Sequence, residues 1–191
     1  MMSDLVGPAV GAFLGVIAGT LITILATRHR ERRAYRQQVQ NLVFELRLNI
    51  KKIDRWLSEI TEYRNKVNGD NLHNWSGYFD LGKAVYATTN RMLDDGSLYT
   101  TLSEQHIEAL QSTIAELSPA GAKYMNEQLA NLRSEFETAR QTHDTYSWFN
   151  VTKQEAVRVA DFWERKMRDH RSVLGEIVSA IDARSIQRRA Q

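Results

Sequence analysis

The histidines and acids of this chain are the residues that could bind a metal or take part in catalysis. The histidines are His29, His73, His106, His143 and His170. None stands in a His-Glu-x-x-His pattern and no Glu-x-x-His pair occurs, so the spacing with which helices usually hold zinc or paired iron ions is missing. The chain also lacks cysteine, which excludes disulfides, thiolate catalysis and cysteine–zinc sites. We therefore predict no metal site and no cofactor.

Two adjacent carboxylates, Asp94 and Asp95, precede Gly96. Paired carboxylates can divide the acid and base roles of a reaction between them, but neighbouring acids before a glycine are typical of a solvated turn. The sequence holds no phosphate-binding loop, Gly-x-Ser-x-Gly elbow or dinucleotide fingerprint. We predict no catalytic residue, and an enzyme whose site is assembled across helices remains an alternative.

Two of the histidines, His143 and His170, fall on apolar helical stripes. A buried histidine usually has a hydrogen-bond partner and a structural role. The alternative is that these two histidines lie on facing helices and titrate together as a pH sensor.

The elements that position these residues begin with an apolar segment. Residues 5 to 27 carry no charge, and as a helix they would measure roughly 34 Å, enough to cross a hydrocarbon core. We predict a transmembrane helix over residues 1–27 and a basic juxtamembrane segment over residues 28–38. By the positive-inside rule the N-terminus would lie outside and the body in the cytosol. The arginines that set this topology and could meet lipid headgroups are Arg28, Arg30, Arg32, Arg33 and Arg36.

Two alternatives compete with a membrane span. A cleaved signal peptide would carry its positive charge before a shorter apolar core, whereas here the charge follows a long one. A buried helix of a soluble protein would rarely stay uncharged for so long. The segment also places small residues four apart, which resembles the glycine zipper, a general membrane packing motif. We expect this stripe to pack against another helix; it consists of Gly7, Gly11, Gly15, Gly19, Thr23 and Thr27.

The rest of the chain is predicted to be all-α. It has few helix breakers, no strand alternation and no internal repeat. We predict a helical bundle of four or five helices over residues 39–183, its first helix continuous with the membrane span, and a basic polar tail over residues 184–191. The first bundle helix shows a coiled-coil-like 4-3 repeat that Arg64 alone interrupts: Val39, Val43, Leu46, Ile50, Ile53, Leu57, Ile60, Arg64 and Val67.

The sequence also predicts where the helices begin and end and which further stripes are buried. We expect the first bundle helix to end at residues 68–71 and a turn over residues 94–97. Ser103, Ser118-Pro119 and the Thr152/Glu155 pair are predicted to begin the later helices. The predicted buried stripes of the last two helices are Ala122, Met125, Leu129, Leu132, Phe136 and Ala139, followed by His143 and Tyr146, and Ala156, Ala160, Trp163, Met167, His170, Leu174, Ile177 and Ile181.

Two aromatic-rich stretches lie near helix breaks, at residues 73–79 and 145–150. They would form a recognition surface if exposed and a small satellite core if covered. The residues are Trp75, Tyr78, Phe79, Tyr146, Trp148 and Phe149.

Taken together, the sequence favours a non-enzymatic, single-pass membrane protein. Its stripe would join copies of the chain or other membrane proteins, and its cytosolic bundle would scaffold a protein partner. The alternative function is a membrane-active effector whose clustered helices form a pore. A net charge of +2 argues against a nucleic-acid partner, and no small-molecule substrate is identified.

Overall fold

The computed structural model describes the backbone of residues 6–77, 84–141 and 146–187. Within these ranges it describes the side chains of residues 19–77, 84–141 and 149–185. The chain divides into two compact units, residues 1–41 and residues 42–191, each of which is described by itself.

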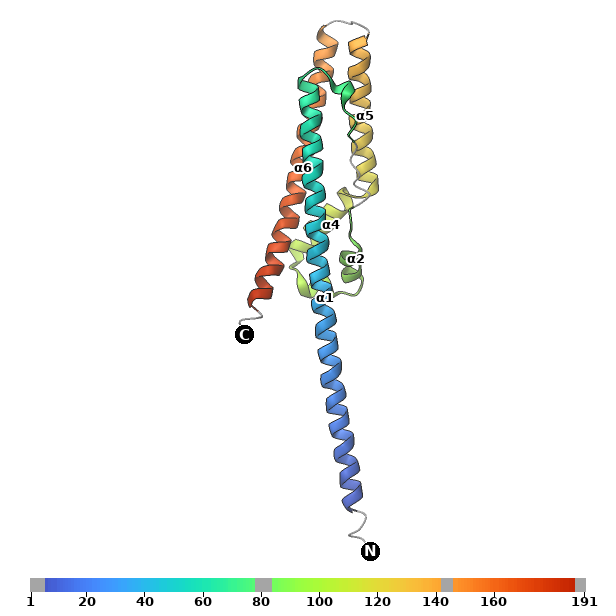
Figure 1. Ribbon diagram of the computed structural model, residues 1–191, viewed down its shortest axis with the longest axis vertical. Coiled ribbons are helices and arrows are strands. Elements are labelled where there is room, and N and C mark those ends of the chain that lie inside the picture. Colours follow the sequence, from blue (N-terminus) through green and yellow to red (C-terminus); the bar gives the residue numbers. More distant parts are fainter. Residues whose placement is uncertain (1–5, 78–83, 142–145, 188–191) are drawn as a thin grey trace. The chain divides into compact units, whose positions relative to one another are not determined.

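All regular structure in the described residues is helical, which confirms the predicted all-α class. The order is α1 (Val6–Asn68), the 3₁₀ helix η1 (Leu72–Asn74), α2 (Ala87–Asp94), α3 (Ser97–Thr101), α4 (Glu104–Glu116), α5 (Pro119–Gln141) and α6 (Tyr146–Gln187). Figure 1 shows the course of these elements along the chain. The second unit is the predicted helical bundle, built from the end of α1 and the elements after it.

The predicted transmembrane helix is contradicted. Among the residues whose side chains are described, no helix has both the length and the apolar character needed to cross a bilayer. The described part of the uncharged run extends only from Gly19 to Thr27, and arginines follow it at once, whereas a span needs about 20 apolar residues. The prediction of a membrane span is therefore wrong, and so is the predicted single-pass location with the N-terminus outside. Gly7, Gly11 and Gly15 lie outside the described side chains.

The C-terminus of α1 falls where the sequence predicts it. Asp70 takes the left-handed conformation, with φ of 57°. The backbone N–H of Asn71 donates to the carbonyl of Lys66 at 2.9 Å, and that of Asp70 to the carbonyl of Val67 at 3.1 Å. This pair of bonds is the Schellman arrangement that ends many helices. Lys153 of α6 then donates to the carbonyl of Asn68 at 3.3 Å, which places a cation at the negative end of α1.

The buried seam of α1 in the second unit is displaced by one residue from half of the predicted positions. Four of the predicted residues, Leu46, Ile53, Ile60 and Val67, are buried. At each of the other four predicted positions in this unit, the residue one before the predicted one is buried instead. The buried seam is Leu42, Leu46, Asn49, Ile53, Trp56, Ile60, Tyr63 and Val67, and Glu45 is also buried beside it. Arg64 therefore does not interrupt the seam, because Tyr63 occupies the seam position and Arg64 lies beside it.

This displacement makes a testable prediction about two neighbouring residues. Leu42 is fully buried, whereas Val43 is only half-buried. We expect Leu42→Ala to lower the free energy of unfolding by about 2–5 kcal/mol and Val43→Ala by about 1 kcal/mol. Urea denaturation of the two variants would measure the difference, and equal losses would contradict the observed seam.

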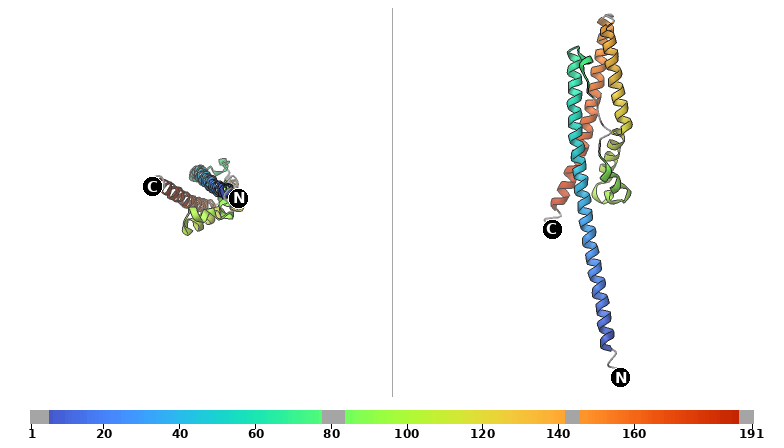
Figure 2. Two further views of the ribbon diagram at one scale, coloured as in Figure 1. Left: turned by 90° about the horizontal axis from the view of Figure 1, so that it is seen from below. Right: turned by 45° about the vertical axis from the view of Figure 1, so that its right-hand side comes forward.

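Helices α5 and α6 supply most of the remaining core and lie side by side in both ribbon views (Figures 1 and 2). Every predicted stripe residue of α5 is buried, and in α6 all are buried except Trp163, which is half-buried. The prediction that α6 begins at Thr152 is wrong, because α6 starts at Tyr146 and Thr152 is a buried residue inside it.

Ion pairs fix α1 and α6 as antiparallel neighbours in the second unit. As residue numbers rise along α1 and into the turn that follows it, those of the partners on α6 fall. The pairs are Arg47–Asp182 at 2.7 Å, Asp54–Arg171 at 2.5 Å, Arg64–Asp161 at 2.6 Å, Arg64–Glu164, and Asp70–Lys153 at 2.7 Å. Most of these side chains are substantially exposed, so each pair contributes little free energy. Their consistent order sets the register of the two helices.

Candidate functional site

Asp94, Asp95 and His106 lie at helix ends. Asp94 and Asp95 are exposed at the end of α2, and the Asp95 carboxylate accepts from the backbone N–H of Ser97 at 2.8 Å. His106 Nδ1 lies 2.9 Å from Ser103 Oγ at the start of α4. Within the described residues, no group of three or more metal-binding side chains could hold an ion. His143 lies outside the described part of the chain, so the predicted pairing of His143 with His170 is not described.

His170 instead lies beside two charged side chains, the carboxylate of Glu116 and the ammonium group of Lys166. Its Nε2 lies 3.1 Å from Glu116 Oε2, and Lys166 Nζ lies 2.9 Å from the same oxygen. His170 and Lys166 come from adjacent turns of α6, and Glu116 is the last residue of α4. His170 lies on the predicted apolar stripe, whereas no local pattern marks Glu116, because their contact joins two helices.

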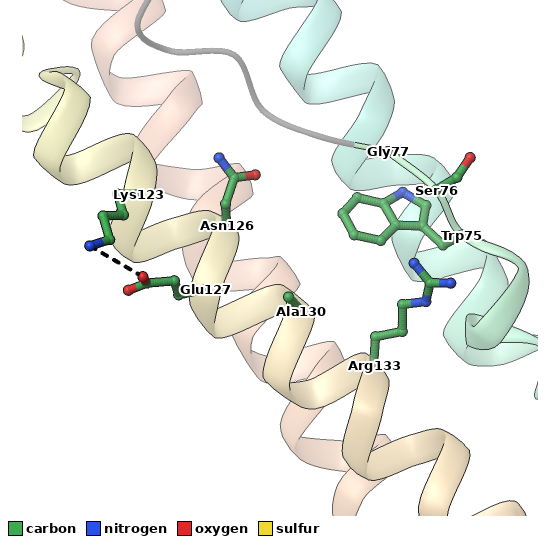
Figure 3. A pocket seen from close by; sticks show the side chains of 8 residues that line it. All are labelled: Trp75, Ser76, Gly77, Lys123, Asn126, Glu127, Ala130 and Arg133. Atoms are coloured by element: carbon green, nitrogen blue, oxygen red, sulfur yellow. Dashed lines mark ion pairs between the residues drawn. The ribbon is translucent and has the colours of Figure 1, made fainter.

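A half-open groove of about 470 Å³ lies between the segment after η1 and α5. Figure 3 shows the indole of Trp75 and the guanidinium of Arg133 beside each other, with Lys123 and Glu127 further along α5. Arg133 donates to the carbonyl of His73 at 3.0 Å, and Lys123 pairs with Glu127 at 3.6 Å. The groove's charged groups therefore already have partners in the fold.

The structure describes two of the six aromatic residues predicted as a partner surface. Trp75 is buried and meets Tyr63 edge-on, with ring centroids 5.0 Å apart. Phe149 is half-buried and packs on Phe136 at 4.8 Å. Tyr78 and Phe79 lie outside the described residues, as do the side chains of Tyr146 and Trp148, so for these the surface stays a prediction.

A different aromatic group lies on α5 and α6, in which Tyr124 and Phe162 are exposed and Trp163 is half-buried. Trp163 contacts Phe162 and Tyr124, with ring centroids 5.2 Å and 6.2 Å away. Its indole N–H donates to Gln128 Oε1 at 3.0 Å. Trp163 belongs to the predicted buried stripe, and the adjacent Phe162 is the one sequence signal that two neighbouring rings could not both face inward.

The described members of the predicted small-residue stripe face open space in the first unit. A Cβ added at Gly19 would meet nothing within 4 Å. Thr23 Oγ1 donates to the carbonyl of Gly19 at 2.8 Å, within its own helix, and Thr27 is exposed. The five predicted arginines are also exposed, and Arg28 and Arg32 border a shallow surface depression with Glu31 and Tyr35.

The first unit also carries four exposed aliphatic residues within five consecutive positions. The exposed fractions are 55% for Leu21, 67% for Ile22, 43% for Ile24 and 64% for Leu25. We call these four residues the Leu21–Leu25 surface. Single exposed apolar residues are ordinary on proteins, but a contiguous group of them is typical of an interaction surface.

Comparisons with known proteins give no further assignment. No family model, curated protein or solved structure matches the chain. Among the described residues, the Leu21–Leu25 surface is the candidate site, because water contacts four neighbouring aliphatic side chains there.

Proposed function

We propose that this chain is a non-enzymatic association protein, whose copies join through the Leu21–Leu25 surface. The helical bundle is then the folded body that association brings together and presents to protein partners. The observation that supports this proposal is the exposure of four aliphatic side chains within five consecutive positions of one helix. Elsewhere, exposed aliphatic residues such as Val85 and Val151 stand apart along the chain.

The free energies involved predict reversible association. Each of these half-exposed side chains would contribute about 1 kcal/mol on burial, so two copies would gain about 8 kcal/mol. Association costs about 4–15 kcal/mol in lost freedom of motion. Since the two terms are of similar size, we expect a complex that forms and dissociates with protein concentration.

The neighbouring charge adds a dependence on salt. Arginines occupy five of the nine positions from 28 to 36, and Glu31 is the only acid among them. Copies that meet at residues 21–25 in a parallel arrangement would bring these like charges near one another. Salt screens such repulsion, so we expect tighter association at high than at low ionic strength, the opposite of a complex held by ion pairs.

Sedimentation velocity of the full chain tests this function. The wild type should show a concentration-dependent rise in sedimentation coefficient that is larger at high salt. The double variant Ile22→Ser/Leu25→Ser should sediment as a monomer under the same conditions. Phe44→Ser is the matched control, because Phe44 lies on the same helix, is 71% exposed and belongs to the other unit.

Three outcomes would contradict the proposal. They are a wild type that stays monomeric at every concentration, a double variant that associates like the wild type, and a chain that sediments only together with added phospholipid vesicles.

A further inference from the structure

A cluster of arginines follows the Leu21–Leu25 surface on the same helix of the first unit. The five arginines between residues 28 and 36 are all exposed. Within the part of the chain that the structure describes, none of their guanidinium groups forms an ion pair or a hydrogen bond. A group of cations without acidic partners keeps a strong positive potential, which attracts anions.

Helical periodicity places three of these arginines in line with the apolar surface. Arg32 follows Leu25 by seven residues and Arg36 follows Arg32 by four, so the three residues share one face of α1, which Arg33 borders. We call Arg32, Arg33 and Arg36 the arginine face. Glu31, the one acid among residues 28–36, follows Leu25 by six residues and lies about 120° around the helix from it. The acid is therefore not part of the arginine face.

The cluster is short and isolated along the chain. Residues 28–36 cover about 12 Å of helix. Residues 1–27 contain no lysine or arginine, and the next one after Arg36 is Arg47, in the second unit. A nucleic acid is usually bound through many phosphate contacts over a longer basic surface. The cluster is therefore better suited to a small ligand that carries several negative charges.

Phosphate is an anion that arginine fits well. A guanidinium group can donate two parallel hydrogen bonds to one phosphate group, and it stays charged at every ordinary pH. One exposed ion pair contributes little to binding, whereas a chain of linked phosphates can bind several arginines at once. The ligand class that matches the arginine face is therefore a soluble polyphosphate.

We propose that the arginine face binds soluble polyphosphates and that the bound ligand strengthens the association of two copies. This inference rests on the proposed association through the Leu21–Leu25 surface. In a parallel pair, the two arginine faces lie next to each other about 10–17 Å along the helix from Leu25, where their charges repel. A polyphosphate between them replaces this repulsion with attraction. Because it binds the pair more tightly than a single copy, it shifts the equilibrium toward the pair.

Lipid headgroups carry phosphate too, but the proposed pair favours the soluble ligand. Two copies that join cover their Leu21–Leu25 surfaces against each other, so these side chains no longer face a bilayer. A soluble polyphosphate can still reach both arginine faces.

Sedimentation velocity of the full chain with sodium tripolyphosphate tests the site. All samples have the same ionic strength, which is adjusted with sodium chloride, so that general screening is equal. Tripolyphosphate should lower the protein concentration at which half of the chains are associated several-fold relative to sodium chloride alone. Orthophosphate, which carries one phosphate group, should have little effect.

Two double variants locate the effect. Arg32→Gln/Arg36→Gln should associate in sodium chloride at least as well as the wild type, because repulsion is weaker, and tripolyphosphate should not strengthen its association. The matched control is Lys51→Gln/Arg55→Gln, which should respond to tripolyphosphate like the wild type. Lys51 and Arg55 are also exposed and four residues apart on α1, and neither has an ion pair among the described residues.

The outcomes separate this inference from the proposed function. If the wild type associates but tripolyphosphate acts no more strongly than orthophosphate, the polyphosphate site is overturned and the association stands. The same holds if Arg32→Gln/Arg36→Gln responds like the wild type. A chain that binds phosphatidylserine vesicles but not tripolyphosphate would also overturn the site. A wild type that stays monomeric with and without tripolyphosphate would contradict both proposals.

Discussion

Glu45→Ala is expected to lower the free energy of unfolding by about 3 kcal/mol or more. Glu45 lies on α1 and is 4% exposed. Its carboxylate accepts from the backbone N–H of Thr88 at 2.7 Å, the backbone N–H of Thr89 at 3.0 Å and the Thr89 hydroxyl at 2.6 Å. The N-cap residue of α2 makes no side-chain capping bond. Glu45 therefore caps α2 from another helix, and alanine would leave three buried or half-buried donors without an acceptor.

Asn49 lies one turn after Glu45 on α1 and also bonds the segment before α2. Its amide donates to the carbonyl of Val85 at 2.7 Å and accepts from the N–H of Val85 at 2.9 Å. Glu45 and Asn49 together hold the chain that enters α2. Urea denaturation is the measurement, with Glu62→Ala as the control because Glu62 is exposed on the same helix. A loss below about 1 kcal/mol for Glu45→Ala would show that α2 does not depend on this cap.

Alanine substitution at the two glycines of the later helices should change the free energy of unfolding in opposite directions. Because a Cβ at Gly121 would overlap the backbone oxygen of Glu116, Gly121→Ala should destabilise the chain by about 1–3 kcal/mol or more. A Cβ at Gly175, inside α6, meets nothing within 4 Å. Gly175→Ala should therefore stabilise the chain by up to about 1 kcal/mol, the difference in helix propensity.

Thermal unfolding of both glycine variants would measure these signs side by side. Helix propensity alone would make both variants more stable, so a stabilised Gly121→Ala would contradict the tight corner between α4 and α5. A destabilised Gly175→Ala would contradict the open environment of that residue.

Apolar periodicity predicted the helices of the bundle well, because long stripes report which face of a helix is buried. It located α5 and its core, whereas helix-breaking residues predicted the end of α1 at residues 68–71 and a capping serine predicted the start of α4 at Ser103. Periodicity placed half of the α1 seam one residue late, since residues such as Val43 and Leu42 are both apolar. Only packing decides between such neighbours, and polar Asn49 in the seam gave no apolar signal at all.

The errors at the two long helices have separate physical causes. At α6, the Thr152/Glu155 pair matches the capping-box pattern. The same pair of residues can also lie inside a helix, so the pattern alone does not mark where a helix starts. At α1, the uncharged run predicted a membrane span from composition, and the described side chains contain too few apolar residues in one helix for it. The contacts of Glu45 and Glu116 were out of reach, because residues 43 to 54 positions apart in sequence share no local pattern.

The central claim is that copies of the chain meet at the Leu21–Leu25 surface, and cysteine cross-linking tests it most directly. The chain has no native cysteine, so Leu25→Cys would place a single thiol within this surface. Tyr99→Cys is the matched reference, since Tyr99 is 62% exposed and Leu25 is 64% exposed. Under mild oxidation of dilute protein, we predict that Leu25→Cys forms covalent dimers several-fold faster than Tyr99→Cys. Equal rates for the two variants would mean that the thiols meet only by random collision, and would contradict the claim.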